Sequence, residues 1–294
     1  MAGLREIKKR MSAVKNIQRI TRTMQMIATA KFTAAQQRAE ASKPYSTKVQ
    51  QLVRDVTAAC DDVDHPLVNG PGEKQGRELL LVIGSDRGLC GAYNANVLRT
   101  AMNHIRDVRD EKAQRIDVET SGKKPVAYFR FQKVDLAERL TIGDKPTYDQ
   151  ISDLAERYIN AFAAGHYDAI RVAYMRFEST SRQTPVIEQL MPLQAEQAEN
   201  AGDESRQAQA VYDFSPSSEE LLRDLLPLAV KTHLFQAFND AVVSEQIMRM
   251  VAMNAATENA KDFGQTLKRN FNRARQSQIT TELMEVIGGS AALE

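Results

Sequence analysis

The chain has 294 residues and a formal net charge of +1, and 43% of its residues are hydrophobic, a composition typical of a folded globular protein. The near-neutral charge argues against a protein that is committed over its whole surface to nucleic acid or acidic lipid. The two cysteines, Cys60 and Cys90, exclude a disulfide framework, and no run of about 18 apolar residues predicts a transmembrane helix.

Residues 1–60 predict one long helix with a narrow apolar stripe. No glycine occurs between Gly3 and Gly70, and Pro44 is the only proline of this segment, where we expect a kink. Successive gaps of three residues around Val14 break a strict heptad, so we expect an irregular supercoil there. The basic start lacks the apolar core of a signal peptide, and we interpret it as part of the helix. The predicted stripe consists of Leu4, Ile7, Met11, Val14, Ile17, Ile20, Met24 and Ile27.

Strand and helix patterns alternate over residues 77–193, after a linker rich in Gly and Pro over residues 61–76. Residues 78–86 predict a buried strand that enters a turn. Residues 94–112 predict a helix, and residues 147–165 predict another that ends at a glycine. This alternation is typical of a small α/β domain.

The second half of this domain predicts more strands. We expect residues 124–131 to continue the alternation as a strand, and residues 168–177 and 185–193 to form two strands joined by a polar turn. The resulting sheet should be mostly parallel. Residues 194–214 contain few apolar side chains, so we expect a mobile loop.

Residues 215–294 predict a second long helix. Beyond Pro227 there is no proline, so some sixty residues could form a helix of roughly 90 Å at about 1.5 Å per residue. Two long terminal helices can cover each other's apolar stripes, which predicts an antiparallel coiled coil with a Rossmann-like α/β domain between its helices. The stripe of this helix comprises Phe235, Phe238, Val242, Met248, Ala252, Ala255, Asn259, Phe263, Leu267, Phe271, Ala274 and Leu283.

The segment GSDRGLCGAYN, residues 84–94, follows a predicted strand and precedes a helix, as many phosphate-binding turns do. Its glycines at 84, 88 and 91 fit neither the P-loop nor the dinucleotide pattern. We therefore expect a structural turn or a docking loop, with a phosphate-binding enzyme as an alternative. The four histidines and the acidic residues are dispersed along the chain, so we expect no catalytic site, no metal site and no cofactor.

Basic residues dominate both ends of the predicted rod. In the first forty residues nine Lys and Arg side chains accompany only Glu6 and Glu40, and five accompany only Asp262 near the end of the last helix. A solvated helix face is the simplest interpretation. Two basic stripes on one hairpin favour an acidic partner around the rod, while the scarcity of aromatic residues argues against nucleic acid.

Four segments resemble, in the same order, the γ subunit of the rotary F-type ATP synthases: residues 1–32, 85–94, 244–260 and 271–293. The resemblance implies a central shaft without chemistry of its own, which couples ion-driven rotation of the membrane c-ring to ATP synthesis or hydrolysis at the β subunits. It implies three α and three β subunits around one shaft, and the ε subunit and the c-ring at its foot. It also implies a peripheral position on the cytoplasmic face of a bacterial inner membrane.

The same resemblance implies which residues contact the α/β hexamer. Arg275, Gln276 and Arg249 match family positions that lie in the coupling region, and Met24 matches a position near the same loops. An adaptor built from a coiled coil and a small α/β module is the remaining alternative. The full set of expected contact residues is Met24, Arg249, Arg275, Gln276, Thr280, Glu282 and Glu285.

Overall fold

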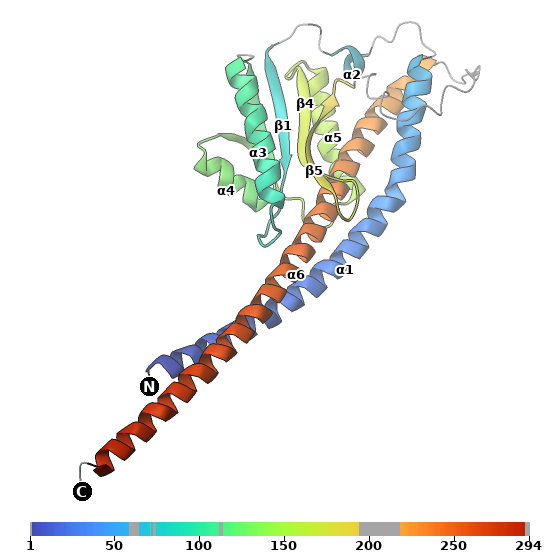
Figure 1. Ribbon diagram of the computed structural model, residues 1–294. Coiled ribbons are helices and arrows are strands. Elements are labelled where there is room, and N and C mark those ends of the chain that lie inside the picture. The colour runs from blue at the N-terminus through green and yellow to red at the C-terminus, as the bar shows by residue number, and fades with distance from the viewer. Residues whose placement is uncertain are drawn as a thin grey trace. The chain divides into compact units, whose positions relative to one another are not determined.

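The computed structural model describes residues 2–58, 65–70, 72, 75–111, 114–193 and 218–291 (Figure 1). The chain divides into two compact units, one of Met1–Ala30 with Arg249–Glu294 and one of Lys31–Met248. The predicted loop over residues 194–214 and most of the predicted linker over residues 61–76 lie outside the described residues. Within that linker, Pro66–Asn69 forms the one-turn helix α2, and the His65 side chain accepts a hydrogen bond from the backbone of Leu67.

Two long helices begin and end the described chain. Helix α1 (Ala2–Ala58) continues through Pro44. Helix α6 (Ser218–Ala291) has 74 residues and includes Pro227, whereas the uninterrupted helix was expected only beyond this proline. A proline inside a helix removes one backbone hydrogen bond. Burial of the leucines on both sides of Pro227, Leu226 and Leu234 among them, offsets this loss.

A five-stranded sheet forms the centre of the second unit, in the order β3-β2-β1-β4-β5. All neighbours pair in parallel except β4 and β5, so the prediction of a mostly parallel sheet is confirmed. In the register of the sheet, Leu80 lies opposite Val118 on one side and Arg171 on the other. The strands are β1 (Arg77–Ile83), β2 (Arg115–Ser121), β3 (Leu136–Leu140), β4 (Ala169–Phe177) and β5 (Gln183–Met191).

One predicted strand is wrong. Residues 124–131 belong to helix α4 (Lys123–Phe131), in which Pro125 and Phe129 are buried four residues apart on one helical face. The strand of this region is β2, whose alternating Ile116 and Val118 are separated by polar residues. Residues 124–131 were predicted as a strand because a short apolar run is compatible with either a buried strand or a buried helix.

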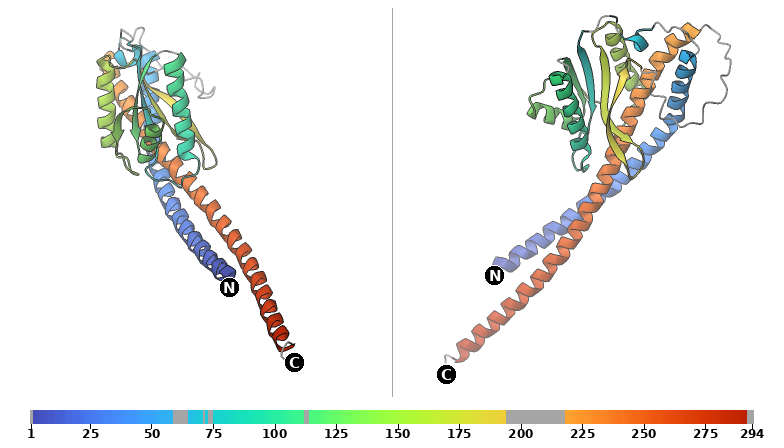
Figure 2. Two further views of the ribbon diagram at one scale, coloured as in Figure 1. Left: turned by 90° about the vertical axis from the view of Figure 1, so that its left-hand side faces the viewer. Right: turned by 45° about the horizontal axis from the view of Figure 1, so that its top comes forward.

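Helices cover both faces of the sheet. Helix α3 (Tyr93–Arg106), which continues into the π-helical turn η1 (Asp107–Glu111), packs on one face with Leu80 and Val82. Helix α5 (Tyr148–Ala163) and α6 pack on the other face with Leu79 and Leu81 (Figure 2). Successive strand residues point to opposite faces, which explains why β1 is one continuous apolar run.

Candidate partner-binding surface

The first unit is an antiparallel pair formed by α1 and α6. Thr257 on α6 donates a hydrogen bond to Thr21 on α1 over 2.8 Å, and Gln25 donates to Asn254 over 3.0 Å. Towards the N-terminus of α1, Val14 packs with Ala260 and Leu267. Residues nearer the N-terminus of α1 therefore contact residues nearer the C-terminus of α6. The predicted antiparallel pairing is confirmed.

The contact line of α1, which we call the seam, keeps a strict alternation of gaps of three and four. Three of its six members are polar. The prediction of a break in the heptad is wrong, because these polar side chains occupy the heptad positions at which no apolar residue was found. On α6 the facing seam residues repeat in the same way. The seam comprises Met11, Val14, Gln18, Thr21, Gln25 and Ala28 on α1, and Met253, Thr257, Ala260, Gly264, Leu267, Phe271 and Ala274 on α6.

Several apolar residues of the predicted stripes lie outside the seam. Ile17, Ile20 and Ile27 are 52%, 55% and 53% exposed. On α6, Phe263 and Leu283 are 52% and 57% exposed, and Ala255 and Asn259 are exposed as well. Met11, Val14, Leu267, Phe271 and Ala274 of the predicted stripes do belong to the seam. Over residues 17–27 of α1 the prediction placed the stripe one position before the seam, because it followed hydrophobicity and not heptad spacing.

One flank of the pair is basic. We define the basic flank as six exposed side chains, each seven residues from its neighbour on the same helix. Five of them directly follow a seam residue, and Lys8 follows Ile7, one heptad before Val14. In an antiparallel pair the two helices are related by a two-fold axis perpendicular to the plane that contains them. Residues that directly follow a seam residue therefore lie on the same side of that plane in both helices. A groove of about 710 Å³ supports this placement, since Arg22 and Lys261 both line it, together with Gln25 and Glu258. The basic flank consists of Lys8, Lys15, Arg22, Lys261, Lys268 and Arg275.

The opposite flank is apolar along residues 17–27 of α1. Ile17, Ile20, Met24 and Ile27 each lie directly before a seam residue of α1, and Phe263 lies directly before Gly264 of α6. Residues before and after a seam position project to opposite sides of a helix, about 100° from it in either direction. The rod thus carries two flanks of different chemistry, and we call these five residues the apolar flank.

The expected contact residues are spread along this unit. Arg275 is exposed on the basic flank, and Met24 is half-buried on the apolar flank. Arg249 is half-buried and lies 26 residues from Arg275, which is about 39 Å along a helix. Gln276, Thr280, Glu282 and Glu285 are exposed on the last turns, where Thr280 donates to the Gln276 carbonyl over 3.0 Å. The structure brings this last group together on neighbouring turns and keeps it apart from Arg249.

Sequence reasoning missed the polar members of the seam. Gln18, Thr21 and Gln25 continue the spacing that Met11 and Val14 begin, so a search for spacing rather than hydrophobicity would have found them. Hydrogen bonds across the seam compensate for their burial.

The Gly-rich turn after β1 uses its polar groups internally. The Ser85 backbone N–H donates to Asn94 Oδ1 over 3.1 Å, and Asn94 Nδ2 donates to the Ser85 hydroxyl over 2.7 Å. That hydroxyl donates in turn to the Arg87 carbonyl over 2.7 Å. A Cβ atom at Gly84 would lie 2.3 Å from a side-chain carbon of Pro125. This glycine therefore permits the close packing of α4 against the turn.

The ends of the parallel strands, where α/β proteins commonly bind nucleotides, are filled. A cavity of about 20 Å³ remains next to Gly84 and Gly122, and α6 closes it with Phe238 and Ala241. Such a volume holds about one water molecule, far less than a nucleotide needs. The expectation of a structural or docking turn is therefore the one that the geometry supports.

Two histidines form pairs with carboxylates that sequence reasoning missed. His104 on α3 lies 2.5 Å from Glu78 on β1, and His233 on α6 lies 2.9 Å from Glu188 on β5. The partners are 26 and 45 residues apart, so no local pattern signals them. Among the residues that the structure describes, no three His, Cys, Asp or Glu side chains could hold a metal ion. Within the same described ranges, no helix is long and apolar enough to cross a membrane.

Comparison with known proteins gives matches over the whole chain. A family model described as ATP synthase matches residues 3–293. The ATP synthase gamma chain of Rhodopirellula baltica is 43% identical over 297 residues, and that of Heliobacterium modesticaldum is 37% identical over 296, each covering 100% of both chains.

Solved structures share the fold. A chain from the central stalk and c-ring of the Tetrahymena thermophila mitochondrial ATP synthase has a TM-score of 0.60 at 20% identity, covering 81% of this chain and 99% of that one. A chain from the rotor of the Euglena gracilis mitochondrial ATP synthase has a TM-score of 0.63 at 16% identity, covering 95% and 99%.

Proposed function

The chain belongs to the family of ATP synthase gamma chains, and we propose that it is the central shaft that couples ion-driven rotation to ATP synthesis or hydrolysis. The observation that carries this proposal is the two-flanked rod of the first unit. A shaft acts by making different contacts in different rotational positions, and a rod with one basic and one apolar flank has this property.

The mechanism follows from differential contact. A surrounding subunit that faces the basic flank meets a different surface from one that faces the apolar flank. Each rotational position then stabilises one set of conformations of the surrounding subunits over another, so rotation and nucleotide affinity are thermodynamically coupled. Acidic segments of those subunits would be attracted to Arg22, Lys261 and their neighbours without forming a permanent lock.

The proposed partners are three α and three β subunits around the shaft, and the ε subunit and c-ring at the second unit. One copy would act in each complex, peripheral to the cytoplasmic face of a bacterial inner membrane. The chain itself would perform no bond chemistry, which fits the internally bonded turn after β1. The proposed contacts with the α/β hexamer are Met24, Arg249, Arg275, Gln276, Thr280, Glu282 and Glu285.

Reconstitution with α and β subunits tests the proposal. Lys268→Glu changes the basic flank, while Arg269→Glu makes the same charge reversal on the adjacent exposed residue outside it. We expect Lys268→Glu to weaken assembly or rotation-coupled turnover by about three- to tenfold, because reversing one exposed charge changes its interactions by roughly 1 kcal/mol. Arg269→Glu should have a smaller effect.

Two results would contradict the proposal. Robust ATP hydrolysis by the isolated chain would contradict the non-catalytic role. Equal losses in the two variants would contradict the role of the basic flank, because only one of the two residues lies on it.

A further inference from the structure

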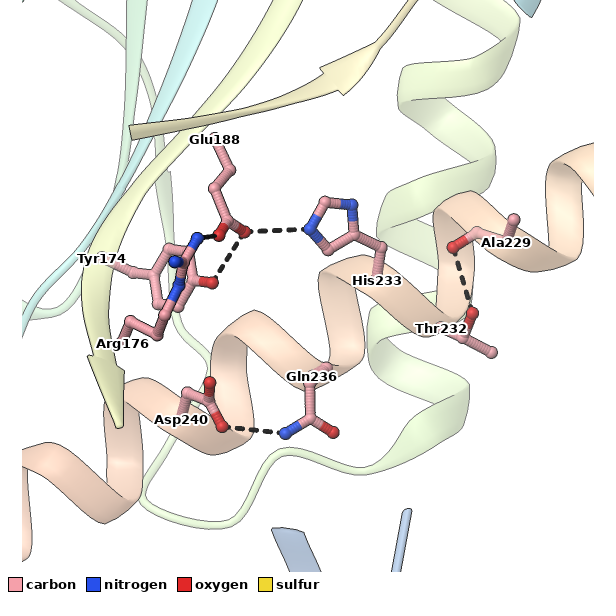
Figure 3. A network of polar contacts seen from close by, with 8 residues as sticks. All are labelled: Tyr174, Arg176, Glu188, Ala229, Thr232, His233, Gln236 and Asp240. Carbon is pink, nitrogen blue, oxygen red and sulfur yellow. Dashed lines mark hydrogen bonds and ion pairs between the residues drawn. The ribbon is translucent and has the colours of Figure 1, made fainter. Parts of the chain in front are cut away.

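A polar cluster lies where α6 packs against the β4–β5 hairpin in the second unit (Figure 3). Glu188 of β5 is at its centre, and its side chain is 13% exposed. It accepts hydrogen bonds from the Tyr174 hydroxyl over 2.7 Å and from His233 Nε2 over 2.9 Å. Arg176 of β4 forms an ion pair with its other oxygen. Two strands and one helix thus converge on one carboxylate.

Asp240 extends the cluster along α6, seven residues or about two turns beyond His233. It accepts a hydrogen bond from Gln236 Nε2 over 2.8 Å and another from the backbone of Phe177. Arg176 also acts on Asp240 electrostatically, so this guanidinium serves both carboxylates. We call Tyr174, Arg176, Glu188, His233 and Asp240 the clasp.

Much of the contact of α6 with this face of the sheet is apolar. Leu226, Val230, Leu234, Ala237 and Ala241 are buried there at gaps of three or four residues. Hydrophobic contact is non-directional. If α6 moved along its axis by one turn, about 5.4 Å, an apolar side chain would again occupy at least four of these five places. Apolar burial therefore fixes the axial position of α6 less strictly than directional polar contacts do.

The clasp responds differently to the same movement. A shift of about 5.4 Å would separate His233 from Glu188 and Asp240 from Arg176. Largely buried polar groups that lose their partners are costly, and setting register is the best-attested role of buried polar contacts. We propose that the clasp sets the axial register of α6 against the β4–β5 hairpin and so prevents the helix from sliding along the sheet.

Hydrogen exchange of the full-length chain tests this proposal. Glu188→Gln removes the central charge and preserves the side-chain shape. Its matched control is Glu178→Gln. Glu178 follows β4 and has local partners: it pairs with Arg182 over 2.7 Å and accepts a hydrogen bond from Thr184 over 2.9 Å. We expect amides of α6 between residues 229 and 245 to exchange about tenfold faster in Glu188→Gln, because a loss of one charged contact corresponds to about that factor. Exchange in α3 and in the control should remain unchanged.

A second variant separates register from stability. The triple replacement Arg176→Met, Glu188→Leu and His233→Leu substitutes apolar side chains for three members of the clasp. Glu188 and His233 are largely buried, and apolar replacements of buried paired groups often preserve or raise stability. Arg176 is 45% exposed, and an exposed charge contributes little to stability. We expect an unfolding midpoint in urea close to that of the unmodified chain, together with faster exchange confined to α6.

Unmodified protection of α6 in the triple variant would overturn the proposal, as would equal exchange in Glu188→Gln and Glu178→Gln. If the triple variant does not fold, the comparison of the two single variants decides. The measurement uses no other subunit. Its result therefore tests the role of the clasp independently of the proposed role in ATP synthase.

Discussion

The replacement Asp240→Asn should make the free energy of unfolding depend more strongly on pH, because in the unmodified chain the opposite effects of Asp240 and His233 cancel. Burial, together with the neighbouring Arg176, lowers the pKa of His233 from 6.5 to about 4. Burial raises the pKa of Asp240 from 3.8 to about 6, against opposing effects of Gln236, Lys43, the Phe177 backbone and Arg176.

The two groups have opposite linkage to folding. The pKa of His233 is depressed in the folded chain, so its contribution to stability is lost as the pH falls from 6.5 towards 4. The pKa of Asp240 is raised, so its contribution is lost as the pH rises from 3.8 towards 6. Between pH 4 and 6 the folded chain binds a proton on Asp240, and the unfolded chain binds one on His233. The folded and the unfolded chain then bind the same number of protons at these two residues. Their effects on the pH dependence of the unfolding free energy therefore cancel.

The size of each effect follows from the displaced pKa values. Each displacement exceeds two pKa units and corresponds to at most about 3 kcal/mol. Relative to the unmodified chain, Asp240→Asn should gain up to about 3 kcal/mol of unfolding free energy as the pH rises from 4 to 6. His233→Gln should gain a similar amount in the opposite direction, as the pH falls from 6.5 to 4.

Urea unfolding at several pH values between 4 and 6.5 measures both differences. Asp262→Asn makes the same replacement at an exposed position of α6 and is the matched control. The reasoning would be refuted if the curves for Asp240→Asn and His233→Gln could not be distinguished from that of the control. Slopes of the same sign in the two variants would refute it as well.

Three further predictions concern other parts of the chain. Gly122→Ala should lower the unfolding free energy in urea by about 2–4 kcal/mol, because φ is +98° and the added Cβ would lie 2.4 Å from a backbone carbonyl oxygen; Gly143→Ala, with nothing within 4 Å of its Cβ, is the control. Arg275→Ala should impair the reconstituted complex while leaving the melting temperature of the isolated chain almost unchanged, because exposed positions contribute within about 0.5 kcal/mol; equal losses would indicate a structural role. Replacing both Thr21 and Thr257 by Val should change the melting temperature little or raise it, because removing both partners of a hydrogen bond leaves no unpaired group; either single replacement should be the more destabilising.

Local pattern predicted the larger elements of this fold. The two terminal helices, the strand over residues 77–83 and the strands over residues 169–177 and 183–191 each follow from hydrophobic period and from the placement of Gly and Pro. Helix α5 also has a local start signal, a capping box between Thr147 and Gln150. These features depend on interactions within a few residues along the chain, so the sequence by itself determined them.

Only the tertiary structure decided which faces of these elements are buried. A hydrophobicity pattern placed Ile17 and Ile20 in the contact with α6, but the heptad register of the facing helix places Gln18 and Thr21 there, both half-buried, and leaves the two isoleucines exposed. The clasp joins Glu188 to His233 across 45 residues. Whether a side chain is buried, paired or free to contact a partner depends on what packs against it, and for these residues the answer comes from segments far away in the chain.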